Sequence, residues 1–84
     1  MTMTVSIQDN KFVPSTINVS AGTTVRWVQD GVAVHDVTGN GFSSGLLKSG
    51  ETFEFTFSTP GTYQYECQIH TIGRAFMRGS VVVQ

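Results

Sequence analysis

The chain has 84 residues, of which 39% are hydrophobic and 13% are charged, and its formal net charge at pH 7 is −1. This length fits one domain, residues 1–84, and the apolar content is well above that of disordered chains. The near-neutral charge excludes the basic surface typical of nucleic-acid binding, so we expect no nucleic-acid partner. No apolar run approaches the roughly 18 residues of a membrane-spanning helix, so we expect no membrane span.

Two further features limit the possible cellular settings and sites. The single cysteine, Cys67, excludes an internal disulfide and a four-cysteine zinc site. The first residues, Met-Thr-Met-Thr-Val-Ser-Ile, lack the basic start and apolar run of a signal peptide. We therefore expect either a protein that stays inside the cell or a mature or recombinant form.

Apolar and polar residues alternate in short segments separated by turn residues, a pattern typical of strands. The expected strands are Val5–Ile7, Phe12–Val13, Ile17–Val19, Thr23–Gln29, Val32–Val37, Glu51–Phe57, Thr62–Cys67 and Gly79–Gln84. Residues 38–50 are rich in glycine and serine and should be the least regular part. About seven or eight strands without a helix predict an all-β fold, a two-sheet Greek-key β-sandwich or barrel.

Three patterns predict where side chains point. Val25 and Trp27 should share one face of their strand, with the tryptophan anchoring the core. Phe53, Phe55 and Phe57 should likewise share one face, because they alternate with polar residues. The three consecutive valines of residues 81–83 predict a last strand that is buried on both sides.

Cys67 ends a strand-like run, and His70 follows three residues later. A lone cysteine is more often a small buried hydrophobe, and an isolated histidine is more often structural than a ligand. The only other histidine, His35, lies in an apolar run, and Met77 follows the His70 segment. A thiolate, two imidazoles and a thioether are the ligands of a blue-copper centre. The set indicates copper first, although zinc or cobalt could occupy the same pocket.

Nearly the whole chain resembles the cupredoxins of the plastocyanin, pseudoazurin and amicyanin group. The resemblance rests on Lys11-Phe-Val-Pro14, Gly22-Thr-Thr-Val-Arg-Trp27, His35-Asp-Val37, Pro60-Gly-Thr-Tyr-Gln-Tyr-Glu-Cys67, His70 and Phe76-Met-Arg-Gly-Ser-Val-Val-Val83. It implies a single cupredoxin domain that binds one type 1 copper ion near one end. His35, Cys67 and His70 would be the strong ligands, and Met77 the weak axial ligand. It also implies that Tyr63 forms a tyrosine corner.

Two features depart from the usual pattern of this group. Six residues separate His70 from Met77, more than relatives usually have, so Thr71–Ala75 resembles a lengthened or grafted segment. Met77 can still reach a metal because longer loops cost little closure entropy. The alternative is that Met77 only fills space and that water or a carbonyl near Ala33 or Val34 is axial. Asp36 stands where many relatives have asparagine, and its side chain should bridge to the backbone beside Cys67.

The resemblance implies a small electron carrier that cycles between Cu(I) and Cu(II) and is not an enzyme. Transient redox proteins would dock near His70, beside an apolar patch of Ile69, Ile72 and Phe76 and the positive charges of Arg74 and Arg78. We expect a monomer, and by resemblance a periplasmic or otherwise exported one. The alternatives are a copper-buffering protein and a metal-free interaction sandwich. A multicopper oxidase or copper nitrite reductase needs more histidines, and a Cys-His hydrolase needs a cleft that a small sandwich lacks.

Overall fold

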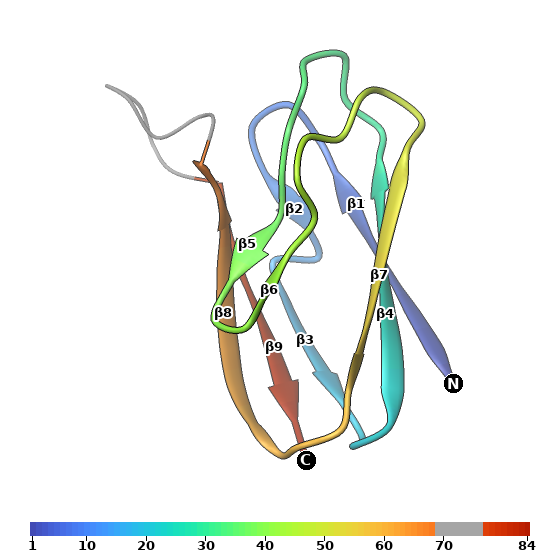
Figure 1. Ribbon diagram of the computed structural model, residues 1–84, viewed down its shortest axis with the longest axis vertical. Coiled ribbons are helices and arrows are strands. Elements are labelled where there is room, and N and C mark those ends of the chain that lie inside the picture. Colours follow the sequence, from blue (N-terminus) through green and yellow to red (C-terminus); the bar gives the residue numbers. More distant parts are fainter. Residues whose placement is uncertain (69–76) are drawn as a thin grey trace.

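The computed structural model describes residues 1–68 and 77–84. In this part of the chain nine strands form two facing sheets (Figure 1). One sheet has the order β2-β1-β4-β7, formed by β1 (Thr2–Ile7), β2 (Phe12–Val13), β4 (Thr23–Gln29) and β7 (Thr52–Phe57). The other has the order β3-β9-β8-β5-β6, formed by β3 (Thr16–Val19), β5 (Thr38–Gly39), β6 (Phe42–Ser43), β8 (Gly61–Cys67) and β9 (Met77–Val83).

The predicted all-β sandwich is confirmed, with more strands than expected. The additional strands are β5 and β6, two residues each, which lie in the segment expected to be irregular. The chain crosses repeatedly between the two sheets, as in Greek-key sandwiches. The pairs β1–β4 and β3–β9 are parallel, and the other strand pairs are antiparallel.

The core lies between the sheets and is centred on Trp27. This side chain is fully buried, as is Val25 on the same face of β4. The indole packs against Phe53 of its own sheet, and against Phe42 and Tyr65 of the other sheet, with ring centroids 5.6, 5.8 and 5.3 Å apart respectively. The prediction that Trp27 anchors the core is therefore confirmed. Aromatic pairs at these separations stabilise a fold beyond their buried area.

The alternation expected along β7 is also confirmed. Phe53 and Phe55 are half-buried and Phe57 is buried, whereas the residues between them are exposed. The expected tyrosine corner is present as well, because the Tyr63 hydroxyl donates a 2.7 Å hydrogen bond to the Thr59 carbonyl. That bond braces the turn from β7 into β8.

The strand predicted at residues 32–37 is wrong. The segment is a loop whose single bridge joins His35 to Leu47. The backbone N–H groups of Val32 and Ala33 donate to the Asp9 carboxylate, 2.9 and 3.0 Å away, instead of to a neighbouring strand. Side-chain acceptors thus compete with a sheet ladder for the donors of this segment.

The last strand is not buried on both sides, so the prediction drawn from its three consecutive valines is wrong. Val81 and Val83 face the core, and Val82 between them is half-buried on the outer face. Only one face of the five-stranded sheet is covered by the other sheet, so alternate residues face solvent. The part of the chain that the structure describes contains no helix with the length and apolar character needed to cross a bilayer.

Candidate metal centre

His35 and Cys67 meet at one end of the sandwich, although they are 32 residues apart in sequence. Cys67 is the last residue of β8, and His35 lies in the loop after β4, at the upper end of the molecule in Figure 1. His35 Nδ1 lies 3.6 Å from Cys67 Sγ, and both residues are fully buried. The bridge to Leu47, with hydrogen bonds of 3.1 and 2.7 Å in the two directions, fixes the backbone of His35. Two of the predicted ligands are therefore already side by side.

Met77 lies directly opposite Cys67. It is the first residue of β9, and the antiparallel register of β8 and β9 pairs the two residues. Residues paired in this way have side chains on the same face of a sheet, and both of these side chains are buried. The thioether of Met77 is therefore on the same face as the thiol, as an axial ligand requires.

The Nδ1 and Sγ separation fits a shared metal ion. Bonds of about 2.3 Å to sulfur and about 2.0 Å to nitrogen, the lengths typical of zinc, at an angle between tetrahedral and trigonal, place the two atoms about 3.5 to 3.7 Å apart. The observed distance is 3.6 Å. Among the described residues, no three His, Cys, Asp or Glu side chains form a metal-binding group, so this site depends on the Met77 thioether as well. His35, Cys67 and Met77 therefore suit one ion, and their soft sulfur and imidazole donors suit copper.

His70, the fourth predicted ligand, lies outside the described residues. The same is true of the apolar patch of Ile69, Ile72 and Phe76, and of Arg74. Arg78 is described: its side chain is exposed and its Nε lies 3.8 Å from Glu66 Oε1. Part of the positive charge expected for docking is therefore balanced by a neighbouring carboxylate on β8.

Asp36 connects the segments that carry the two buried predicted ligands, as the sequence predicts. Its carboxylate accepts a 2.7 Å hydrogen bond from the backbone N–H of Gln68 and a 3.1 Å bond from the Thr38 hydroxyl. Its own backbone N–H points at Cys67 Sγ, 3.4 Å away. Hydrogen bonding around the cysteine sulfur is one of the factors that tune the potential of a blue-copper site.

Asp9 is a contributor that the sequence analysis missed. It lies in the turn between β1 and β2, and its Oδ1 is 3.0 Å from His35 Nε2. The hydrogen bond with His35, followed by those from Ala33 and Val32, lowers the pKa of Asp9 to about 2. In the sequence, Asp9 followed by asparagine is typical of a turn, and nothing local identifies a partner so far along the chain.

A second missed residue supports the loop that carries His35. Gln29 is fully buried at the end of β4, and its Oε1 accepts a 2.7 Å hydrogen bond from the Gly31 N–H. Its Nε2 donates to the carbonyls of Ala33 and Leu47, at 2.6 and 3.2 Å. The Ala33 carbonyl, one of the alternative axial groups, thus already accepts a hydrogen bond from the Gln29 side-chain amide.

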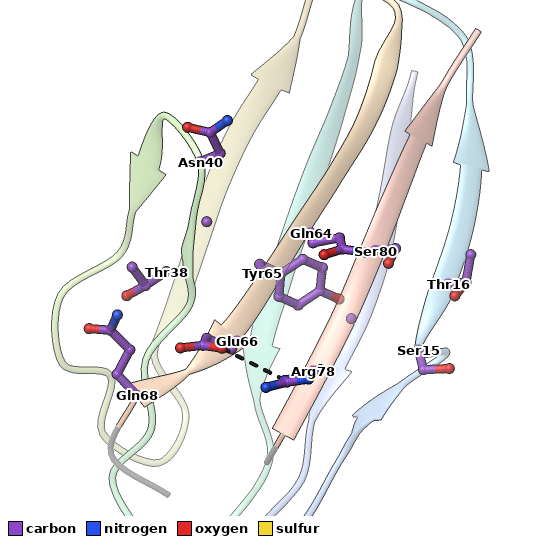
Figure 2. Close-up of a pocket in the computed structure, with 12 residues that line it drawn as sticks. Ser15, Thr16, Thr38, Asn40, Gln64, Tyr65, Glu66, Gln68, Arg78 and Ser80 are labelled. Carbon is purple, nitrogen blue, oxygen red and sulfur yellow. Dashed lines mark ion pairs between the residues drawn. The ribbon is translucent and has the colours of Figure 1, made fainter. Parts of the chain in front are cut away.

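An open groove of about 590 Å³ lies on the outer face of the five-stranded sheet and is separate from the candidate metal centre (Figure 2). Its charged residues are Glu66 and Arg78, whose ion pair crosses from β8 to β9. Side chains alternate along β8, so Gln64 and Glu66 face the groove, whereas Cys67 points into the core. His35, Cys67 and Met77, the predicted ligands among the described residues, do not line this groove.

Comparisons with known proteins agree with the fold and with the predicted resemblance. Residues 1–83 match the family model described as a cupredoxin-like domain. The chain is 33% identical to amicyanin-alpha of Methylorubrum extorquens over 95% of its own length and 70% of that protein's. It is 30% identical to the amicyanin of Paracoccus versutus over 95% of its length, but spans only 63% of that relative. A solved purple cupredoxin from Nitrosopumilus maritimus superposes with a TM-score of 0.86 over 98% of this chain and 99% of that one, at 24% identity, which shows a shared fold. The chain belongs to the cupredoxin-like domain family.

Proposed function

We propose that the protein is a one-electron carrier with a single type 1 copper ion, held by His35, Cys67 and His70 with Met77 as the axial ligand. The observation that carries this proposal is the 3.6 Å approach of His35 Nδ1 to Cys67 Sγ in the fully buried interior, with Met77 opposite the cysteine. Membership of the cupredoxin-like family and similarity to amicyanins support copper over zinc or cobalt.

Bound copper would supply the one-electron redox chemistry, and the protein would contribute a fixed, dry donor set. Cys67 and Met77 are held by the paired strands β8 and β9, and His35 is held by its bridge to Leu47. Donors on such elements move little when the charge at the site changes, and full burial of His35 and Cys67 excludes water from their side of the site. Both properties favour rapid electron transfer over ligand exchange or substrate chemistry.

Transient redox proteins are the proposed partners, and we place their docking surface near His70. Similarity to the amicyanins supports redox partners. We further propose an exported, periplasmic setting. The exposed apolar side chains Val32, Val34 and Leu46 lie in the loops on both sides of the His35–Leu47 bridge. They would extend an apolar surface around the metal centre, and a small apolar contact suits a short-lived redox encounter.

The test is titration of the metal-free protein with Cu(II), followed by optical and EPR spectroscopy and by reduction and reoxidation. Intense visible absorption, narrow copper hyperfine splitting and repeated reversible bleaching are expected for the wild type. Cys67→Ser should abolish the intense absorption, because that absorption arises from copper–thiolate bonding. Copper binding without colour would favour the copper-buffering alternative, and an absence of copper binding would favour a metal-free interaction module.

A further inference from the structure

The turn between β1 and β2 places a carboxylate behind the buried histidine. Asp9 Oδ1 lies 3.0 Å from His35 Nε2, the ring nitrogen opposite the one that faces Cys67. His35 is fully buried, whereas the Asp9 side chain is half exposed. The Asp9 carboxylate therefore extends from the surface to the buried ring, beside the first residues of the loop that carries His35.

The same Asp9 oxygen holds that loop. It accepts hydrogen bonds from the backbone N–H groups of Val32 and Ala33, at 2.9 and 3.0 Å, in addition to its hydrogen bond with His35 Nε2. One oxygen thus fixes both the backbone that precedes the histidine and the ring itself. Two backbone donors already converge on this oxygen, and an aspartate side chain is ordinarily ionised at neutral pH, so the group is a carboxylate there.

An ionised carboxylate can only accept hydrogen bonds, and this decides the tautomer of His35. The proton of the neutral ring must lie on Nε2, where it is donated to Asp9. Nδ1 then carries the lone pair, and that lone pair faces Cys67 Sγ. Hydrogen bonds of this kind from carboxylates orient metal-binding histidines and raise their basicity.

We propose that Asp9 is an anionic positioning residue of the metal centre, which fixes His35 in the tautomer that presents Nδ1 and adds a negative charge that favours Cu(II) over Cu(I). This inference rests on the proposed function only for its second half, because the tautomer is a property of the metal-free protein. The negative charge of Asp9 acts on the metal through the His35 ring, because Asp9 is not itself a ligand.

Three variants separate the roles of Asp9. Asp9→Asn keeps an oxygen that can accept the three hydrogen bonds but removes the charge. Asp9→Ala removes both the charge and the hydrogen bonds. The matched control is Asp30→Asn, because Asp30 is another aspartate at the same end of the sandwich, and its carboxylate accepts a 2.6 Å bond from Ser6 instead of His35.

The first measurement is ¹⁵N NMR of the His35 ring in the metal-free protein. The wild type, Asp9→Asn and Asp30→Asn should all show a proton on Nε2, and Asp9→Ala should show a mixture of tautomers. A wild-type ring protonated on Nδ1, or an Asp9→Ala ring unchanged from the wild type, would overturn the positioning role. This result does not depend on copper.

The second measurement is the metal affinity and reduction potential of the copper-loaded variants. Asp9→Ala should bind Cu(II) about 10- to 100-fold more weakly. Asp9→Asn should have a higher potential than both the wild type and Asp30→Asn. A potential equal to that of Asp30→Asn would refute the charge effect. A wild type that does not bind copper would refute the proposed function instead, and the NMR result would still decide the positioning role.

Discussion

Asp36 Oδ1 accepts a 2.7 Å hydrogen bond from the backbone N–H of Gln68, so this carboxylate joins the segment that follows one predicted ligand to the segment that follows the other. His35 precedes Asp36, and Cys67 precedes Gln68. The relative position of imidazole and thiol is thus supported by a hydrogen bond that continues the pairing of β5 with β8 beyond Thr38 and Glu66. The Thr38 hydroxyl holds the second oxygen of the same carboxylate.

Asp36→Asn should raise the reduction potential of the copper-loaded protein. The amide oxygen can still accept the Gln68 N–H, so the bridge remains, but the negative charge that stabilises Cu(II) is lost. A tenfold change in the relative affinity for the two oxidation states corresponds to about 59 mV, and we expect a rise of this order. Voltammetry of both proteins checks it. An unchanged potential would show that the Asp36 charge does not act on the site.

Met77 can be tested as a ligand separately from its packing. Met77→Ala should destabilise the metal-free protein by about 2–5 kcal/mol, because the side chain is almost completely buried. Met77→Leu keeps the volume, so it should cost less than about 1.5 kcal/mol. If the thioether ligates copper, both variants should change the ratio of the visible absorption bands. A leucine variant with a wild-type spectrum would show that Met77 is only a packing residue.

Tyr65 should make the stability of the protein fall at high pH. Burial raises the pKa of Tyr65 to about 12. The nearby indole N–H of Trp27 opposes this shift, although it makes no hydrogen bond of good geometry with the Tyr65 hydroxyl. The pKa of Tyr65 is thus higher in the folded protein than in the unfolded chain. The free energy of unfolding therefore keeps its full value below about pH 10 and falls between about pH 10 and 12, where only the unfolded chain has lost the proton. The loss should be on the order of 3 kcal/mol.

Denaturant unfolding at a series of pH values, with the absorbance of tyrosinate recorded in parallel, measures this effect. Tyr65→Phe is the control, because it keeps the ring and removes the ionisable hydroxyl. Its stability should decline less between pH 10 and 12 than that of the wild type. Equal declines in the two proteins would mean that other groups cause the alkaline transition.

Gly79→Ala should destabilise the protein by about 1–3 kcal/mol through overpacking. Gly79 lies opposite Tyr65 in the β8–β9 register, and a Cβ at this position would collide with the ring and hydroxyl of Tyr65. The collision should be relieved when the ring is absent, so Gly79→Ala should cost less in a Tyr65→Leu background. Chemical denaturation of the four proteins of this double-mutant cycle gives the coupling. Additive effects would contradict the proposed contact.

The local sequence was enough to predict most of the strands and to propose a metal site. Strands such as β4 and β8 have an alternation of apolar and polar residues that already encodes which side chains face the core. Cys67, His70 and Met77 are close in sequence, so their common purpose is visible without a structure, and the rare histidine in an apolar run identified His35. The loop at residues 32–37 was mistaken for a strand because its apolar residues resemble one, while the acceptors that prevent pairing lie elsewhere in the chain.

The sequence by itself thus determined the sandwich and the bridging role of Asp36, because alternation, residue chemistry and family motifs are local or shared properties. On the same grounds it predicts the donor set. Tertiary structure alone decided which groups surround His35. Asp9 lies 26 residues before it and Gln29 supports its loop through carbonyls of two separate segments. Such contacts exist only after the sheets have packed together, because hydrogen bonds between distant segments depend on the folded path of the chain and leave no periodic trace in the sequence.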